Sequence, residues 1–359
     1  MEVRVYNPQL QLMGVVEDFI SLLWNRKYNT AGDFELYVPI TSDNVRYFVR
    51  GNIVAYLGSA EAGVIESLEA QQDSKKNQMI IKGRFLESYL DRRLIYAGGP
   101  TQKVSHTVNY SGNTETAMRS LITNAAAIPL LELGEIKGFT DTITFQATFQ
   151  NLLKYESKLA QSASLGFRCI PDFVNKKIIF DIYKGLDHSE SQSDRVRVTF
   201  SDSYNNIDSA DYTENDQLLK TVCFVGGQGE GAEREWVIAG DNALTGLERR
   251  EVRLDATDVS PDDLTTEQYR EKLAERGRSL LEDDDILVKS FECQTIPDGN
   301  FIYKEHYDIG DIVTIKKESW NISVDLRITA ITETYEHGKA EINPTFGNPL
   351  PDTIDWEDK

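Results

Sequence analysis

The chain has 359 residues, of which 40% are hydrophobic and 27% charged, a composition typical of a globular protein with two or three domains. Its 38 basic and 58 acidic residues give a net charge of −20, which argues against wrapping nucleic acid or docking on an anionic membrane. No apolar stretch approaches the roughly 20 residues of a membrane span, and the start of the chain lacks the pattern of a secretory signal. We therefore expect a protein that does not insert into membranes and is synthesised in a cytoplasm.

The residues most often used for metal binding and covalent catalysis are few and scattered. The three cysteines have no CxxC spacing and are interpreted as small buried hydrophobes: Cys169, Cys223 and Cys293. The four histidines give no metal-ligand spacing: His106, His188, His306 and His337. We therefore predict no catalytic, cofactor-binding or metal-binding residue, and no cofactor.

Strands with turn punctuation are predicted over the first 98 residues. The β-rich runs 19–24 and 34–38 flank the turn cluster 29–33, so they are expected to form a hairpin. Three further strands are expected at 51–56, 64–69 and 79–83. Apolar residues at helical spacing over 84–90 then predict a short helix, which ends at 97–100.

Residues 99–212 combine helical and strand patterns. A helix capped by Thr114 is predicted over 114–124, and a second over 149–162. Strands are expected to follow at 166–170, 177–183 and 195–200. This order predicts an α+β domain in which helices cover one face of an antiparallel sheet.

Strand patterns return after residue 213. The runs 218–225 and 234–238 flank a glycine-rich segment, 226–231, which invites comparison with a dinucleotide-binding loop. Such a loop must open into a helix, whereas 233–238 alternates polar and apolar residues, so a hairpin tip is predicted instead.

A helix is then predicted to begin at Ser260, with Pro261 at its first position. The acidic run 282–285 lacks the alternating spacing of a calcium-binding loop and is interpreted as a solvated helix end.

The end of the chain repeats a pattern from its beginning. Residues 310–315 resemble 51–56, and both runs are followed by two more strands after similar intervals. We therefore predict a mainly β, α+β protein with two copies of a small tube-type β-barrel, since closing a sheet removes its exposed edges. The predicted domains are a first barrel at 1–98, an α+β domain at 99–212, a second barrel at 213–245 and 286–350, a helical insertion at 246–285 and an acidic tail at 351–359.

A duplicated barrel has a consequence for assembly. Three chains closing around one axis would place six similar barrels in a ring, which could meet a six-fold tube while the other domains keep three-fold symmetry.

The sequence resembles the siphophage tail-tip or tail hub proteins, a family related to the baseplate hubs of contractile tails. The resemblance covers nearly the whole chain and is carried by segments at 24–28, 32–39, 63–66, 83–86, 90–93, 184–187, 198–201, 246–251, 255–258, 307–313, 327–329 and 346–347. It implies a homotrimer in which each chain contributes two tube-like barrels to a ring. The chain departs from the family at Asp187-His188, where relatives carry Asp-Arg, which puts the role of that arginine in doubt.

The expected function is that of a structural, non-enzymatic hub in the virion that ends the tail tube and gates DNA. The resemblance implies contacts with a distal tail protein, a tape-measure protein and a downstream fibre or receptor-binding protein, and DNA passing without specific binding. One alternative is a cell-wall hydrolase, which needs two carboxylates about 5–10 Å apart or a zinc site. Another is a carbohydrate-binding adhesin, for which Trp236 and Trp320 could stack on sugars. Relatives often continue into a fibre or a peptidoglycan-cleaving domain, so lytic or receptor-binding activity is expected in another polypeptide.

Overall fold

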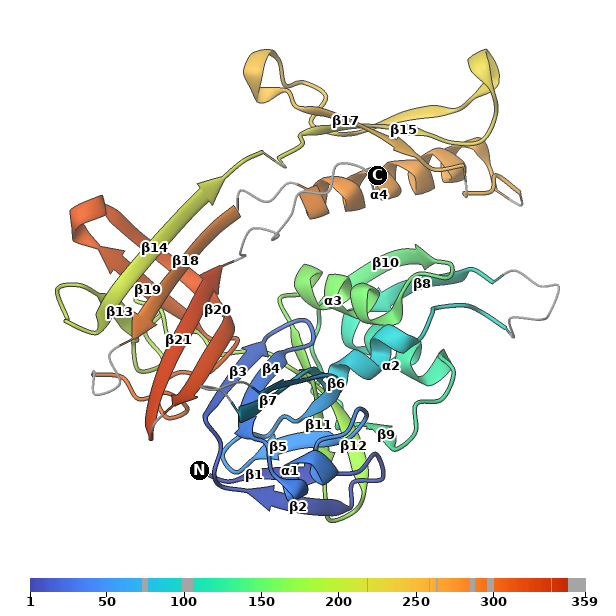
Figure 1. Ribbon diagram of the computed structural model, residues 1–359. Coiled ribbons are helices and arrows are strands. Elements are labelled where there is room, and N and C mark those ends of the chain that lie inside the picture. The colour runs from blue at the N-terminus through green and yellow to red at the C-terminus, as the bar shows by residue number, and fades with distance from the viewer. Residues whose placement is uncertain are drawn as a thin grey trace. The chain divides into compact units, whose positions relative to one another are not determined.

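The computed structural model describes residues 1–72, 77–98, 106–217, 219–257, 259–262, 264–284, 288–295, 300–336 and 338–347 (Figure 1). The chain forms two compact units, unit 1 with residues 1–211 and 292–347, and unit 2 with residues 212–291 in the described part. Both are rich in strands, which confirms the predicted mainly β, α+β class. No helix among the described residues is long and apolar enough to cross a membrane.

The first repeat contains every strand that the sequence predicted for it. Its five strands are β3 (Ser21–Lys27), β4 (Asp33–Pro39), β5 (Ile53–Tyr56), β6 (Gly63–Gln72) and β7 (Asn77–Phe85). They pair in the order β3-β4-β7-β6-β5, and the hairpin predicted around 29–33 is confirmed. Four shorter elements accompany them: β1 (Val3–Tyr6), β2 (Leu12–Val16), α1 (Ser42–Tyr47) and the 3-10 helix η1 (Leu86–Arg92), which lies where a helix over 84–90 was expected.

The second repeat has the same strand order as the first, β14-β18-β21-β20-β19. Its strands are β14 (Ile207–Asn215), β18 (Val288–Thr295), β19 (Ile312–Lys317), β20 (Ile322–Glu336) and β21 (Lys339–Gly347). Two short elements join it, β13 (Thr199–Ser201), which pairs with β19, and the 3-10 helix η4 (Glu318–Trp320). The predicted similarity of the two ends of the chain therefore extends to the pairing of five strands.

The repeats also match at single hydrogen bonds. Gly51 donates its N–H to the carbonyl of Ile65, and Gly310 does the same to Ile328, both at 2.8 Å. The two glycines have φ angles of 90° and 93°, a left-handed conformation that favours glycine. A β-bulge follows Ile65 in β6 and Ile328 in β20. These shared irregularities make a chance recurrence of similar strands a poor explanation.

The two repeats join in one sheet through a single junction. Residues 330–336 of β20 pair antiparallel with all seven residues of β3. The strands of this sheet then follow one path from β14 to β2, with β13 and β19 beside it, and the described part of this path does not return to its start. Within one chain the strands of the two predicted barrels thus form a continuous sheet with two ends, because the long strand β20 serves both repeats.

The region between the repeats packs helices and short strands against the first repeat. Its elements are β8 (Val108–Asn113), α2 (Thr114–Asn124), β9 (Leu131–Leu133), β10 (Thr142–Ala147), α3 (Leu152–Ser162), β11 (Gly166–Asp172) and β12 (Lys177–Tyr183). The two helices and the strand pair β11–β12 lie where the sequence predicted them. Asn113, and not Thr114, caps α2, since its side chain accepts the N–H of Thr116 at 2.9 Å.

Unit 2 holds the segment where the structure differs most from the predicted arrangement. The hairpin β15 (Val222–Gly226) and β16 (Trp236–Gly240) is present, but β15 also pairs in parallel with β17 (Glu251–Asp255). Helix α4 (Thr266–Asp284) covers one face of this sheet, where Cys223, Val225 and Leu273 share a core. The hairpin β15–β16, predicted as part of the second barrel, thus folds with β17 and α4 of the predicted insertion, because α4 buries the inward residues of the hairpin. The partner of β14 in the second repeat is β18, which follows α4 in the sequence.

The start of α4 corrects another prediction. Ser260 and Pro261 precede the helix, which begins at Thr266. Thr265 accepts the N–H of Gln268 at 3.3 Å, and the Gln268 side chain accepts the N–H of Thr265 at 2.9 Å. This reciprocal capping box satisfies backbone donors that Ser260 is too far away to reach.

Candidate functional site

The buried polar cluster at the junction of the two repeats is the candidate site, and it begins with the alternation of β3. Leu22 and Trp24 turn inward and are fully buried, and Arg26 is the next inward residue of the same strand. Its side chain is only 4% exposed. A guanidinium at such a position needs partners, because an unpaired buried charge is strongly unfavourable.

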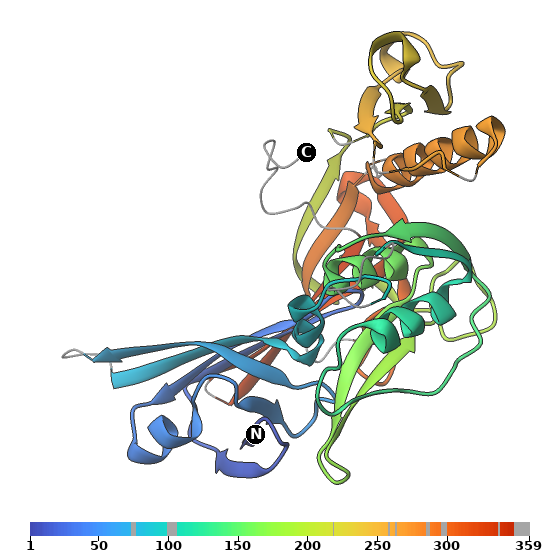
Figure 2. The ribbon, with the colours of Figure 1, turned by 90° about the vertical axis from the view of Figure 1, so that its right-hand side faces the viewer.

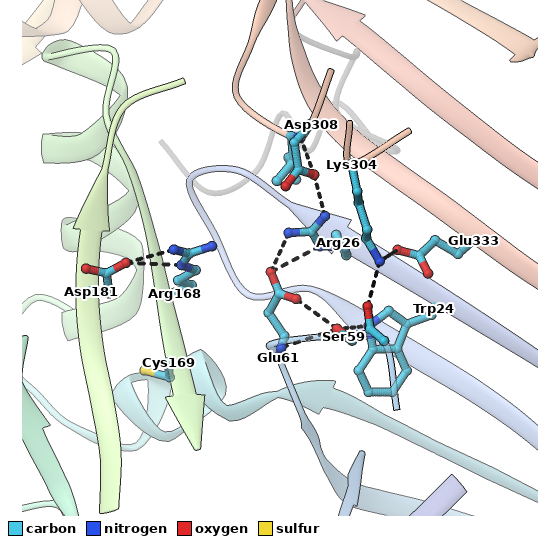
Figure 3. A network of polar contacts seen from close by, with 12 residues as sticks. Trp24, Arg26, Ser59, Glu61, Arg168, Cys169, Asp181, Lys304, Asp308 and Glu333 are labelled. Atoms are coloured by element: carbon cyan, nitrogen blue, oxygen red, sulfur yellow. Dashed lines mark hydrogen bonds and ion pairs between the residues drawn. The ribbon is translucent and has the colours of Figure 1, made fainter. Parts of the chain in front are cut away.

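Arg26 receives partners from both repeats (Figure 3). Its Nε and Nη2 donate to Glu61 Oε1 at 3.0 and 2.7 Å, and Glu61 lies between β5 and β6. Its Nη1 donates to Asp308 Oδ1 and to the Tyr303 hydroxyl, both at 2.6 Å, and these residues precede β19. One guanidinium therefore ties segments that are about 280 residues apart in the chain.

Glu333 forms a second centre in this cluster. It lies on β20 and is fully buried, directly opposite Trp24 in the β20–β3 pairing. Its carboxylate accepts the hydroxyl of Tyr303 at 2.8 Å, that of Tyr335 at 2.7 Å and that of Tyr56. Lys304 Nζ lies 3.2 Å from it and donates to the carbonyl of Gly58 at 2.9 Å.

The electrostatics of the cluster favour its charged carboxylate at Glu61 and its neutral phenols. Burial alone would raise the pKa of Glu61, but the charge and hydrogen bonds of Arg26 outweigh it and hold that pKa below its usual value. Burial, followed by the charge of Glu333, raises the pKa of Tyr56 far above its ordinary range. Burial likewise raises the pKa of Tyr303, against the charge of Arg26.

The chemistry of this cluster is structural. Ser59 continues it by donating to Glu61 Oε2 at 2.8 Å and accepting the indole N–H of Trp24 at 3.2 Å. The guanidinium, the carboxylates and the phenols thus satisfy one another, which is the condition under which a buried polar network specifies one arrangement of its surroundings. The arrangement fixes how the two repeats meet.

Two further buried acids lie outside the junction. Glu87 accepts the N–H of Cys169 at 2.5 Å, and burial raises the pKa of its carboxyl to about 8. Glu156, on α3, is fully buried without a hydrogen-bond partner among the described residues, and burial raises its pKa well above the usual value. Burial thus favours the neutral acid at both positions.

The Asp187-His188 pair, where the chain departs from the family pattern, binds the segment after β12 to the second repeat. His188 donates its backbone N–H to the carbonyl of Ile312 and its Nδ1–H to the carbonyl of Val196, both at 2.8 Å. Its Nε2 lies 3.8 Å from Asp311 Oδ2, and Asp311 Oδ1 accepts the N–H of Leu186 at 2.7 Å. The imidazole thus faces the carboxylate of Asp311.

The remaining candidates from the sequence lie apart from one another. The glycine-rich segment 226–231 connects β15 to β16 as a hairpin, which confirms that it does not open into an α-helix. The three cysteines are all buried. Of the acidic run 282–285, residues 282–284 end α4, while Asp285 lies outside the described residues, as do His337 and the tail 351–359.

The two tryptophans proposed for sugar stacking are both exposed but belong to different units. Trp236 is on the face of the β15–β17 sheet opposite α4, with the guanidinium groups of Arg234 and Arg253 at 4.9 and 5.5 Å from its ring. Trp320 is in η4, with Lys317 at 5.5 Å.

Sequence reasoning missed the junction cluster itself. Arg26 and Asp308 were noted only as parts of longer similar segments, and Glu61 and Glu333 were not noted. The available signal is the arginine in an inward position of a strand whose other inward residues, Leu22 and Trp24, are apolar.

The fold and this junction define a class of protein, a mainly β protein with two repeats joined by a buried ionic cluster. The model of the family described as Siphovirus ReqiPepy6 Gp37-like protein matches residues 2–348, so the chain belongs to this family of phage tail proteins. The resemblance to siphophage tail proteins is thereby confirmed. No match was found among curated proteins.

Three solved structures share the fold over nearly the whole chain. A tail protein from Neisseria meningitidis MC58 is 14% identical, with a TM-score of 0.58 and 96% of each chain covered. The 43 kDa tail protein of prophage MuSo2 from Shewanella oneidensis is 12% identical, with a TM-score of 0.57 and 96% and 98% covered. Prophage tail protein gp18 from Listeria monocytogenes EGD-e is 15% identical, with a TM-score of 0.53 and 97% and 95% covered.

Proposed function

We propose that this phage tail protein is the structural hub of the tail tip, a homotrimer that forms a pseudo-six-fold ring, ends the tail tube and gates the passage of DNA. The observation that carries the proposal is the duplication of five strands with the same pairing order in one chain. Three such chains present six similar units, so one face of the ring can meet a six-fold tube and the rest can follow three-fold symmetry.

The junction cluster supports this proposal because it holds the two repeats of one chain in a fixed relation. A ring closes only if the rotation between neighbouring units is constant. Arg26 takes partners from both repeats, and Glu333 lies on the strand that they share, so a change in their relation would expose or unpair these charges. The expected distal tail, tape-measure and fibre or receptor-binding partners would bind this ring, in the virion, after synthesis in the host cytoplasm.

The net charge of −20 supports a passage for DNA without binding. Acidic residues lining a narrow channel would repel the phosphate backbone, since charge repulsion is stronger where water is limited. A trimer whose channel is basic or apolar would contradict this part of the proposal.

The test of the ring is the mass of the particle in solution. The full chain is measured by analytical ultracentrifugation across a range of concentrations, alone and with the adjacent distal tail protein. A trimer in either condition supports the proposal, and a dimer in both contradicts it.

The proposal also includes the absence of enzymatic activity. We expect purified protein to leave the turbidity of a peptidoglycan suspension unchanged, with lysozyme as the positive control. Clearing of the suspension by this chain would contradict the structural function and favour a cell-wall hydrolase.

A further inference from the structure

The junction within the chain shows what one repeat offers to another. Residues 330–336 of β20 pair with β3, and Tyr28, just after β3, donates its N–H to the carbonyl of Thr329 at 2.9 Å. The ring of Tyr28 also packs over Gly310, where an added Cβ would lie 2.3 Å from its Cε2 atom. The edge of β20 beyond its bulge is therefore completely covered by another repeat.

The correspondence between the repeats locates the same edge in the first one. Since Ile65 matches Ile328, residues 330–335 of β20 match residues 67–72 of β6. This part of β6 pairs with β7 on one side, whereas β5 pairs only with Gly63 and Val64. In the described part of the chain, no strand covers the other side of 67–72, and Figure 2 shows the β6–β7 ribbon extending beyond β5.

Burial at matched positions differs as expected for a covered and an uncovered edge. Ile331 and Glu333 in β20 are fully buried, whereas their counterparts Leu68 and Ala70 are half-buried and exposed. The position over Gly51, which matches Gly310, is also open, since an added Cβ there meets nothing within 4 Å. The first repeat thus has a surface equivalent to the one that β3 and Tyr28 cover in the second repeat, and among the described residues this surface is uncovered.

The complementary half of the junction is present at the other end of the sheet. β14 matches β3 in strand order and is the terminal strand, so it has one edge without a strand partner among the described residues. Its first residue, Ile207, is buried, whereas Ser209 and Asp211 further along the strand are exposed. Each chain therefore contains one complete junction, β3 with β20. It also has two open edges, that of β14 and that of residues 67–72 in β6, which could form a second junction of the same kind.

We propose that β14 of one copy adds as an antiparallel strand to residues 67–72 of β6 in a second copy of this chain, repeating between chains the β3–β20 junction. The inference rests on the proposed ring and names the interface that would close it. The two halves lie on different surfaces, so the contact is head-to-tail, the kind that generates rings. Pairing the two open edges also removes a site of uncontrolled aggregation.

The correspondence predicts which backbone groups make this contact. The N–H of Tyr28 bonds to the carbonyl of Thr329, so in an antiparallel pair every second residue of β20, including Glu333, directs its backbone groups at β3. The counterpart of Glu333 is Ala70, whose N–H accordingly faces the open edge and not β7. Ala70→Pro therefore removes one donor from the interface while the β6–β7 ladder keeps its hydrogen bonds.

The test compares the full-length chain with Ala70→Pro and with the matched control Ala70→Ser, which keeps the N–H. Their masses are followed by analytical ultracentrifugation over concentration, alone and with the distal tail protein. Ala70→Pro is expected to weaken self-association roughly 100-fold, through the lost hydrogen bond and the clash of its ring, and Ala70→Ser less than about threefold. Equal circular dichroism spectra of the two monomers show that β6 and β7 still form.

Hydrogen exchange of the unmodified chain provides an independent measurement. On assembly, peptides covering 66–72 and 207–215 are expected to gain protection, and peptides in β3 and residues 330–336 of β20 to stay unchanged. If the unmodified chain and Ala70→Pro form trimers equally well, or if 66–72 gains no protection in the trimer, this interface is wrong and the ring stands. If the unmodified chain never forms a trimer, the proposed ring itself fails, and this interface with it.

Discussion

Replacing Arg26 with methionine should destabilise unit 1 strongly. Methionine has a similar length, so the change removes the charge and its hydrogen bonds while largely filling the space. Glu61 is then left with a side chain 6% exposed and without the cation that it accepts from at 2.7 and 3.0 Å. Breaking a buried ion pair from one side typically costs about 3–5 kcal/mol, and we expect the free energy of unfolding to fall by this amount.

The loss of the ion pair between Arg26 and Asp308 adds little to this loss of stability. Asp308 has a side chain that is 43% exposed, so water can replace Arg26 there. Glu61 therefore determines the effect, and Glu61→Gln in the Arg26→Met background removes its stranded charge. We expect the double variant to recover at least about half of the lost stability, since replacing both members of a buried pair is often nearly neutral.

The assay is urea unfolding at pH 7, monitored by tryptophan fluorescence. The unmodified chain, both single variants and the double variant together form a double-mutant cycle. Without Arg26, the folded-state pKa of Glu61 rises above its unfolded value. The penalty is then fully present above that raised pKa and shrinks as the pH falls toward the unfolded pKa. A loss below about 1 kcal/mol for Arg26→Met, or one that grows on acidification, would refute this reasoning.

Three further outcomes are expected. Burial raises the pKa of Glu87 to about 8, so its contribution to stability is most favourable below its unfolded pKa near 4.5 and falls as the pH rises to 8. Glu87→Gln should therefore raise the free energy of unfolding at pH 7 by about 3 kcal/mol. It should also flatten the profile of Tm between pH 5 and 8. Gly51→Ala should cost about 1 kcal/mol from its positive φ alone, whereas Gly310→Ala should cost at least about 2 kcal/mol because its Cβ meets Tyr28, and equal urea midpoints would contradict this difference. Replacing residues 216–287 by a copy of 28–32 should leave unit 1 folded, as judged by the near-ultraviolet circular dichroism of its tryptophans, and a featureless spectrum would count against two separate units.

The sequence predicted elements whose signals are local. The alternation in β3 and β4 around Gly32, and the apolar stripes of α2 and α3, are each contained in about a dozen residues, so nearby residues decide the structure. The repeat was found for the same reason, since the pattern of Gly310 and Ile312 copies that of Gly51 and Ile53.

What the sequence could not decide depends on pairing over long distances. The sequence assigned the 218–238 hairpin to the second repeat, where the structure has β14 and β18 beside β21. β14 reads Ile-Asp-Ser-Ala-Asp-Tyr-Thr-Glu-Asn, with little apolar alternation, so its local pattern does not predict a strand. The start of α4 was predicted at Ser260 from a local capping pattern, whereas the capping box of Thr265 and Gln268 begins the helix in the structure. From that start Tyr269 and Leu273 join the core of unit 2. The partners of Arg26 are up to 282 residues away, beyond any local pattern.

The position of unit 2 within the second repeat also bears on the order in which the chain folds. β3 and β4 are joined by the five residues 28–32, whereas β14 and β18 are separated by the 72 residues 216–287. Closing the longer connection as an unstructured loop costs about 2 kcal/mol more in chain entropy. This excess falls if unit 2 forms first and brings its two ends together. We therefore expect the first repeat to fold early and the second to wait for the unit inserted in it, so that a slow-folding mutation in α4 would delay β14–β18 pairing without touching either strand.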